Sequence, residues 1–389
     1  MEKQISSLVV KKNLTDYELA FKSNNMMAKL KFIYRILRKI EDNRENLCHI
    51  MGISDPAQAG KKNGKRDEPN EMEKTCLEVL RNVIKGRGGN DTPEKELGLA
   101  YAYMGIAYEI GAFGLVINYK KAYENYICAL KRNHGMGAFR LAVMFEKGIH
   151  TKRSLTKAFT YYRCAAKMGL SEGMHAYGMI LYYCEDEDMR DCRTGFHYIK
   201  LAMVNASPEY PHPYFDLGRI YETGNAALDL YKDCQYAYKI YVRGASFGCP
   251  NCCYRLGRSH EFGELNRSKS WREAIWWYKK AAELGQVDAQ MALSTFYITG
   301  IDRVLDVNYE EAYQWTLKAA VGGHAGAAYS LGGYIEKGIG IKKDPAHALW
   351  WYSISGLFGN KNAKYKIEQL SNDVYMNSTR KKRWWFLPC

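Results

Sequence analysis

The sequence predicts an all-α protein, a right-handed α-solenoid of about seven helical hairpins. A pattern of small, apolar and aromatic residues recurs along the chain with the spacing of one face of a helix. The small residue at its centre recurs about every 38 residues, at Gly105, Ala142, Gly178, Gly218, Gly257, Ser294 and Gly332. A second pattern, of aromatic residues followed by two small residues and a glycine, alternates with the first. One hairpin cannot bury its apolar face alone, so the hairpins must stack.

Residues 272–300 contain both patterns in series, the second helix of one hairpin followed by the first helix of the next. The second helix has adjacent aromatic residues at Trp277 and Tyr278, which we expect in the core between hairpins. Gly285 and Gly300 stand where the two helices should end, at positions that favour a positive φ. The aromatic cluster is therefore interpreted as part of the architecture.

Two tryptophan pairs, Trp276–Trp277 and Trp350–Trp351, raise the question of sugar binding. Trp277 and Trp351 occupy the recurrent aromatic position and are predicted in the core. Trp276 and Trp350 lie about 100° away around the helix, so they are either exposed or packed between hairpins. Because large aromatic side chains are mostly buried for packing reasons, we expect packing.

The chain is divided into four parts. Residues 1–50 contain an amphipathic helical stretch, which we expect to pack on the first hairpins as a cap. Residues 51–75 are polar and rich in glycine and lysine, as in a flexible linker. The solenoid is predicted over 76–371, opening with an unpaired helix at 76–86. Residues 372–389 form a basic and aromatic tail.

Composition favours a cytosolic, reduced protein with acidic partners. No apolar h-region of a signal peptide begins the sequence, and no stretch approaches the ~18 apolar residues that would span a bilayer. Eleven cysteines without regular spacing are expected as reduced thiols. The formal net charge of +14 is a general bias toward acidic surfaces, because most of the excess is scattered along the chain.

No catalytic or cofactor motif is present in the sequence. None of the 9 histidines lies in HExxH, and no GxSxG elbow or phosphate-binding glycine loop occurs. We therefore predict no enzyme, no cofactor, no small-molecule substrate and no nucleic-acid partner. The sequence CPNCC at 249–253 has a zinc-like C-x2-C spacing but lacks a second pair of ligands. Cys252 falls on an inward position of the repeat, so a buried structural cysteine is favoured over a metal site.

The repeat resembles the Sel-one-like repeat, a relative of the tetratricopeptide repeat, from residue 97 to about residue 370. Within that class, FRLAVMFEKG at 139–148, PEYPHP at 208–213 and ALSTFYITG at 292–300 are similar to consecutive repeats of fungal chitin synthase regulatory proteins. The resemblance implies a non-catalytic adaptor that binds and activates or targets a plasma-membrane chitin synthase, its catalytic partner, from the cytosolic side. The alternative is a scaffold of endoplasmic-reticulum quality control, or another protein-interaction scaffold.

Similarity to tetratricopeptide geometry also suggests where a partner binds. Three positions of each first helix should line the concave face, where aromatic residues stand beside glutamates in a peptide groove. The groove residues are Phe139, Glu146, His175, Tyr182, Phe215, Arg219, Glu222, Tyr254, Arg258, Glu261, Tyr329 and Glu336. In the alternative, Arg219–Glu222 and Arg258–Glu261 are only i,i+3 ion pairs that stabilise their own helices.

The C-terminal tail combines cations with aromatic residues. Its candidate membrane-contact residues are Arg380, Lys381, Lys382, Arg383, Trp384, Trp385 and Cys389. Such a mixture suits an anionic membrane surface, while RKKR also resembles a nuclear-localisation signal, and an inert tail is the third interpretation. A prenylation box needs three residues after its cysteine, and Cys389 is the last residue, so we do not expect the prenylation that the fungal family commonly carries.

Overall fold

A computed structural model describes residues 25–51, 71–86, 94–185 and 190–371, with side chains omitted from 42 to 51. Over these ranges the regular structure is helical, and the β-type pairing consists of three isolated bridges in loops. The prediction of an all-α fold is confirmed. The chain divides into two compact units, residues 1–45 with 56–213 and residues 46–55 with 214–389.

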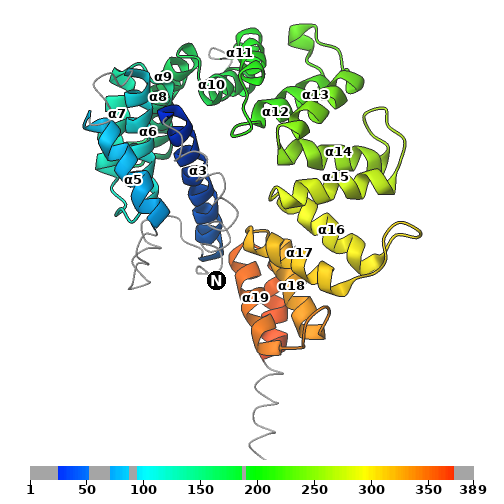
Figure 1. The fold of residues 1–389 in the computed structure, drawn as a ribbon. Helices are drawn as coiled ribbons and strands as arrows, with labels where there is room; N and C mark the ends of the chain where they lie inside the picture. The colour runs from blue at the N-terminus through cyan, green and yellow to red at the C-terminus, as the bar shows by residue number, and fades with distance from the viewer. Residues whose placement is uncertain (1–24, 52–70, 87–93, 186–189, 372–389) are drawn as a thin grey trace, which may run out of the picture. The chain divides into compact units, whose positions relative to one another are not determined.

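Unit 1 contains a long helix, a single short helix and three antiparallel hairpins (Figure 1). Its long helix is α3 (Met26–Met51), of which the part up to residue 45 belongs to this unit, and the short helix is α5 (Glu71–Ile84). The hairpins are α6 (Glu94–Ile110) with α7 (Tyr119–Lys131), α8 (Gly135–Lys147) with α9 (Leu155–Lys167), and α10 (Ser171–Tyr183) with α11 (Cys192–Val204).

Unit 2 continues with hairpins of the same kind. They are α12 (His212–Thr223, from Tyr214 in this unit) with α13 (Cys234–Ser246), α14 (Pro250–Phe262) with α15 (Trp271–Glu283), α16 (Val287–Thr299) with α17 (Tyr309–Val321), and α18 (Ala325–Lys337) with α19 (Pro345–Leu357). A 3-10 turn, η1 (Ala226–Leu228), lies in the first loop, and residues 361–371 form a further helix.

The start of every second helix is fixed by a side-chain cap. At each start a short polar side chain accepts a hydrogen bond from a backbone N–H of the first turn, which satisfies a group that has no partner within the helix. The capping residues are Asn118, Ser154, Asp191, Asp233, Ser270, Asn308 and Asp344. The glycines predicted to end the helices do so, with φ of +91° at Gly285 and +67° at Gly300.

The tryptophan predictions are partly wrong. Trp351 is buried as predicted, but Trp277 is only partly buried, and the core position of its helix is taken by Tyr278. Trp276 and Trp350, which we expected to be packed, are 56% and 46% exposed. Tyr278, and not Trp277, takes the core position because Gly257 of the preceding helix faces it: a Cβ on Gly257 would lie 2.8 Å from the Tyr278 ring.

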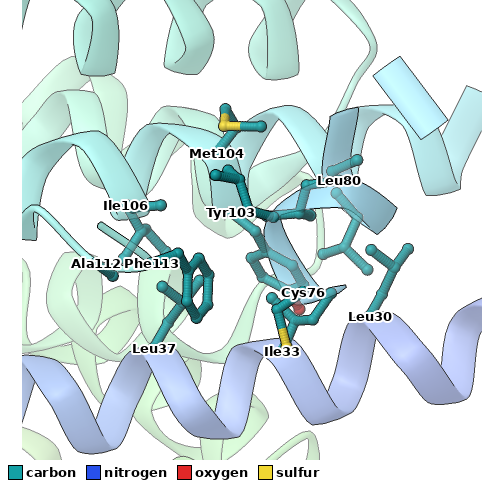
Figure 2. Close-up of a cluster of buried hydrophobic side chains, with 14 of the residues drawn as sticks. Leu30, Ile33, Leu37, Cys76, Leu80, Tyr103, Met104, Ile106, Ala112 and Phe113 are labelled. Carbon is teal, nitrogen blue, oxygen red and sulfur yellow. The ribbon is translucent and has the colours of Figure 1, made fainter. Parts of the chain in front are cut away.

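The core of unit 1 is completed by α3. Leu30, Ile33 and Leu37 are fully buried and point from α3 toward α5, α6 and Phe113 (Figure 2). Burying three such side chains stabilises the unit by several kcal/mol, at about 1.5–3 kcal/mol each. In unit 1, α3 is therefore part of the hydrophobic core. Helix α5, which covers the predicted opening helix, begins at Glu71.

Candidate protein-interaction site

The four predicted glutamates, and also Glu109 at the equivalent position of the first hairpin, are hydrogen-bond acceptors for tyrosines within their own hairpins. In each case the hydroxyl of a buried tyrosine on the second helix donates to the carboxylate of a glutamate on the first helix. The pairs are Tyr126 with Glu109, Tyr162 with Glu146 (2.5 Å), Tyr241 with Glu222 (2.9 Å), Tyr278 with Glu261 (2.5 Å) and Tyr352 with Glu336 (2.6 Å). A buried hydroxyl without an acceptor would destabilise the fold, so the glutamates have a structural reason to be there.

Two of these glutamates also bind a cationic side chain from a neighbouring helix of the chain. Arg255 on α14 binds Glu222 of the preceding hairpin, and its Nε lies 3.1 Å from the carboxylate. Burial tends to raise the pKa of Glu222, but Arg255 and Tyr241 more than offset this, so the pKa is lowered. Lys366 lies 3.2 Å from Glu336, and the pKa of Glu336 is likewise lowered. Both glutamates are charged and already paired at neutral pH.

The predicted aromatic residues of the first helices lie against the same tyrosines. Their rings are half-buried and tilted onto the tyrosine of the second helix, with centroid separations from 5.3 to 6.0 Å. The contacts are Phe139 with Tyr162, Phe215 with Tyr241, Tyr254 with Tyr278 and Tyr329 with Tyr352. In each of these four hairpins the aromatic ring of the first helix, the tyrosine and the glutamate thus contact one another in series.

The two arginines among the predicted groove residues, Arg219 and Arg258, are exposed, as is Glu146, which accepts the hydrogen bond of Tyr162. The two arginine side chains are 52% and 44% accessible, and their nearest carboxylates, on Asp216 and Glu264, are 3.9 and 3.8 Å away. The alternative prediction was i,i+3 pairs of these arginines with Glu222 and Glu261, but the ion pairs found are with Asp216 and Glu264. Such loose, exposed ion pairs contribute little to stability.

In unit 1, by contrast, α3 lies on the first helices. Tyr34 of α3 stacks on Tyr103 of α6 with a centroid separation of 5.2 Å, and its hydroxyl donates to Glu172 of α10 at 3.3 Å. Glu41 of α3 binds both terminal nitrogens of Arg140 of α8, at 2.6 and 2.9 Å. In this unit, a helix of the chain itself thus occupies the kind of face that solenoids use to bind partners.

The predicted groove residues of α10 are also engaged within unit 1. His175 and Tyr182 are both buried. His175 Nδ1 shares a hydrogen bond of 2.9 Å with the Tyr210 hydroxyl, and Tyr182 packs edge-on against Tyr183. Neither side chain offers an open surface comparable with that of Arg219 or Arg258.

Arg140 and Arg255 were missed by the sequence analysis, although both occupy the same position of the repeat. Arg140 has Glu41 as its close partner, with Glu109 of the preceding hairpin at 3.9 Å, whereas Arg255 binds the equivalent glutamate, Glu222, directly. The signal was available: an arginine just before the core leucine of a first helix, at a position where other hairpins have uncharged residues or an aspartate.

Two candidate sites remain, the cysteines at 249–253 and the C-terminal tail. Cys252 is buried as predicted, together with Cys249 and Cys253. Within the described ranges, no three His, Cys, Asp or Glu side chains come together as metal ligands. The candidate membrane-contact residues of the tail, 380–389, lie outside the described residues.

Among the helices described, none combines the length and the apolar character needed to cross a bilayer.

The family model of the Sel1 repeat matches residues 98–134, 135–170, 214–246, 250–286, 287–324 and 325–356, together more than half of the chain. The chain belongs to the Sel1 repeat family. The fold agrees, because a crystal structure of a Sel1 repeat protein from Oxalobacter formigenes superposes with a TM-score of 0.55 at 24% identity, covering 79% of this chain and 83% of that one. The predicted α-solenoid of Sel-one-like repeats is confirmed.

Two curated relatives bear out the more specific resemblance. Chitin synthase regulatory factor 3 of Schizosaccharomyces pombe is 29% identical over 312 residues, which is 79% of this chain and 33% of the relative. Chitin synthase regulator SKT5 of Saccharomyces cerevisiae is 27% identical over 279 residues, 71% of this chain and 40% of the relative. This Sel1 repeat chain therefore spans well under half the length of either relative.

Proposed function

We propose that this Sel1 repeat chain is a non-catalytic adaptor that binds a membrane chitin synthase and activates it or directs it to its place in the membrane. The observation that carries the proposal is the similarity, over most of the chain, to two proteins named as chitin synthase regulators. Stacked helical hairpins provide extended surfaces for protein partners. The absence of catalytic motifs from the sequence agrees with a binding role.

The mechanism proposed is differential binding. An adaptor shifts its partner toward an active or correctly located state only if it binds that state more tightly than the others. The exposed arginines of α12 and α14 are the described residues best suited to such binding, because their charges are only loosely paired. We place the chain on the cytosolic face of the plasma membrane, with the tail residues 380–389 in contact with anionic lipid.

The test is affinity purification of the tagged chain from its own cells, followed by mass spectrometry. We expect a chitin synthase catalytic subunit among the recovered proteins, and lower chitin synthase activity in membranes from cells that lack the chain. Addition of the purified chain should restore that activity. Recovery of endoplasmic-reticulum degradation machinery without any chitin synthase would instead support the alternative scaffold function and refute the proposal.

A further inference from the structure

The strongest unassigned surface lies on the first helices α12 and α14 of unit 2. Arg219 and Arg258 each follow the central small residue of the repeat, so they occupy equivalent positions on neighbouring hairpins. Arg219 lies over the Phe215 ring at 5.9 Å, and Arg258 lies over the Phe262 ring at 5.6 Å. We call these two arginines, with Phe215, Tyr254 and Phe262, the arginine face.

The equivalent position in unit 1 shows what such a surface can hold. Ile106 follows the central Gly105 of α6, and it is fully buried in the cluster that α3 completes (Figure 2). At the position of Ile106, unit 2 has exposed arginines on α12 and α14 instead of a buried apolar residue. This position of the repeat is therefore buried on α6, within the cluster that α3 completes, and exposed on α12 and α14.

The contacts of α3 show how far apart the contact residues are on a helix that crosses two first helices. Tyr34 contacts Tyr103 of α6, and Glu41 contacts Arg140 of α8. Tyr103 and Arg140 occupy one repeat position on successive first helices, and their partners on α3 are about two helical turns, or about 10 Å, apart. That distance matches the usual separation of packed helices, about 8–10 Å. A helix that crosses two first helices therefore presents residues i and i+7 to equivalent positions.

From these observations we propose that the arginine face binds an acidic amphipathic helix of a partner protein, laid across α12 and α14 as α3 lies across α6 and α8. Two carboxylates at i and i+7 of that helix pair with Arg219 and Arg258. Apolar side chains between them contact Phe215, Tyr254 and Phe262. The charge of the partner follows from the two cations, whose own carboxylate neighbours are near 4 Å and are easily replaced.

The partner class deepens the proposed function, since the helix would belong to the chitin synthase, but the surface can be tested without it. The probe is a synthetic 20-residue helical peptide with two glutamates at i and i+7 on a leucine-bearing face. Its binding to the full chain is measured by fluorescence anisotropy. The comparison peptide has glutamine in place of both glutamates.

The variants distinguish binding at the arginine face from attraction to the general positive charge of the chain. Arg219→Glu with Arg258→Glu changes the arginine face, whereas Arg243→Glu with Arg272→Glu makes the same change in charge at exposed residues on second helices of unit 2. We expect the acidic peptide to bind the unchanged chain and the control at least tenfold more tightly than it binds the R219E/R258E variant. Circular dichroism should show the same helix content for all three proteins.

Equal affinity of the three proteins for the acidic peptide would overturn the proposal, because binding would then reflect only the net charge of the chain. If the unchanged chain binds the glutamine peptide as tightly as the acidic peptide, the proposed pairing with carboxylates is overturned. In cells, a chitin synthase that still co-purifies with R219E/R258E would refute the arginine face while leaving the adaptor function intact. If the unchanged chain recovers no synthase but binds the acidic peptide through these arginines, the adaptor function fails and the surface stands.

Discussion

Replacing Glu41 with glutamine should loosen α3 from unit 1. The Glu41 carboxylate binds Arg140 through two hydrogen bonds, and the Arg140 side chain is almost entirely buried. Burial tends to raise the pKa of Glu41, but Arg140 and, to a smaller extent, Arg38 more than offset this and lower the pKa from 4.5 to about 2. The variant leaves a buried guanidinium without its close charged partner.

The size of the effect follows from the same geometry. A pKa lowered by that amount corresponds to about 3 kcal/mol of stabilisation at neutral pH. Removing one partner of a buried ion pair costs about 3–5 kcal/mol. Glu109 lies 3.9 Å from the Arg140 guanidinium, and the equivalent Glu222 binds Arg255 directly, so Glu109 can take over part of the charge. We therefore expect a loss of about 2–3 kcal/mol.

Hydrogen exchange is the appropriate assay, because unfolding of a two-unit chain need not be a two-state process. Backbone amides of α3 should exchange about thirtyfold faster or more in the Glu41→Gln variant, since each factor of ten corresponds to about 1.4 kcal/mol. Amides of α14 in unit 2 should not change. Glu124→Gln, at an exposed carboxylate of α7, is the control. An α3 exchange rate within twofold of that control would refute the assignment of Glu41 as the residue that holds α3.

Three further predictions follow from the packing. Because the pKa of Glu41 is lower folded than unfolded, its stabilisation is present above about pH 4.5 and lost toward pH 2; the α3 exchange of Glu41→Gln should depend less on pH in that window. Tyr278→Phe removes a buried hydroxyl donor and should lower stability by about 1–2 kcal/mol in denaturant titrations. Gly332→Ala places a Cβ 2.8 Å from the Tyr352 ring and should destabilise by about 1–3 kcal/mol, whereas Gly333→Ala, 3.6 Å from the Tyr352 hydroxyl, should be neutral or stabilising.

The hairpins could be predicted because their information is local. The spacing of small and aromatic residues fixes which helix face is buried, and the glycines that end the helices stand in the same place in most repeats. The error at Trp277 shows the limit of that argument. Adjacent aromatic residues differ by about 100° around a helix, and only the packing against Gly257 identifies Tyr278 as the buried one.

The packing of α3 on the first hairpins was predicted, but its individual contacts could not be, because they join distant parts of the chain. Its apolar stripe identifies an amphipathic helix and nothing more. Glu41 and Arg140 are 99 residues apart, and Tyr34 and Glu172 are 138 apart. No periodic pattern connects such pairs. Although a cap on the first hairpins was expected, nothing in the sequence indicated that the Glu41 carboxylate pairs with the buried Arg140.

The third and sixth hairpins explain why the glutamates are structural. In the third, Ile199 replaces the tyrosine and Tyr182 replaces the glutamate, and the helices meet through glycine: a Cβ on Gly178 would lie 2.9 Å from the Gly195 carbonyl oxygen. The Sel1 repeat matches leave out this hairpin, residues 171–213. Tyrosine and glutamate are lost together there.

The sixth hairpin makes the same exchange with different residues. Serine at 294 replaces the central glycine, Thr316 replaces the tyrosine, and Ile298 replaces the glutamate. The hydroxyls of Ser294 and Thr316 hydrogen-bond to each other at 2.5 Å, so no carboxylate is needed. A glutamate kept for a partner would have no reason to disappear with a tyrosine of its own hairpin. Arg219 and Arg258 are not tied in this way to a tyrosine of their own hairpins. They are therefore the first residues to test for binding of a partner.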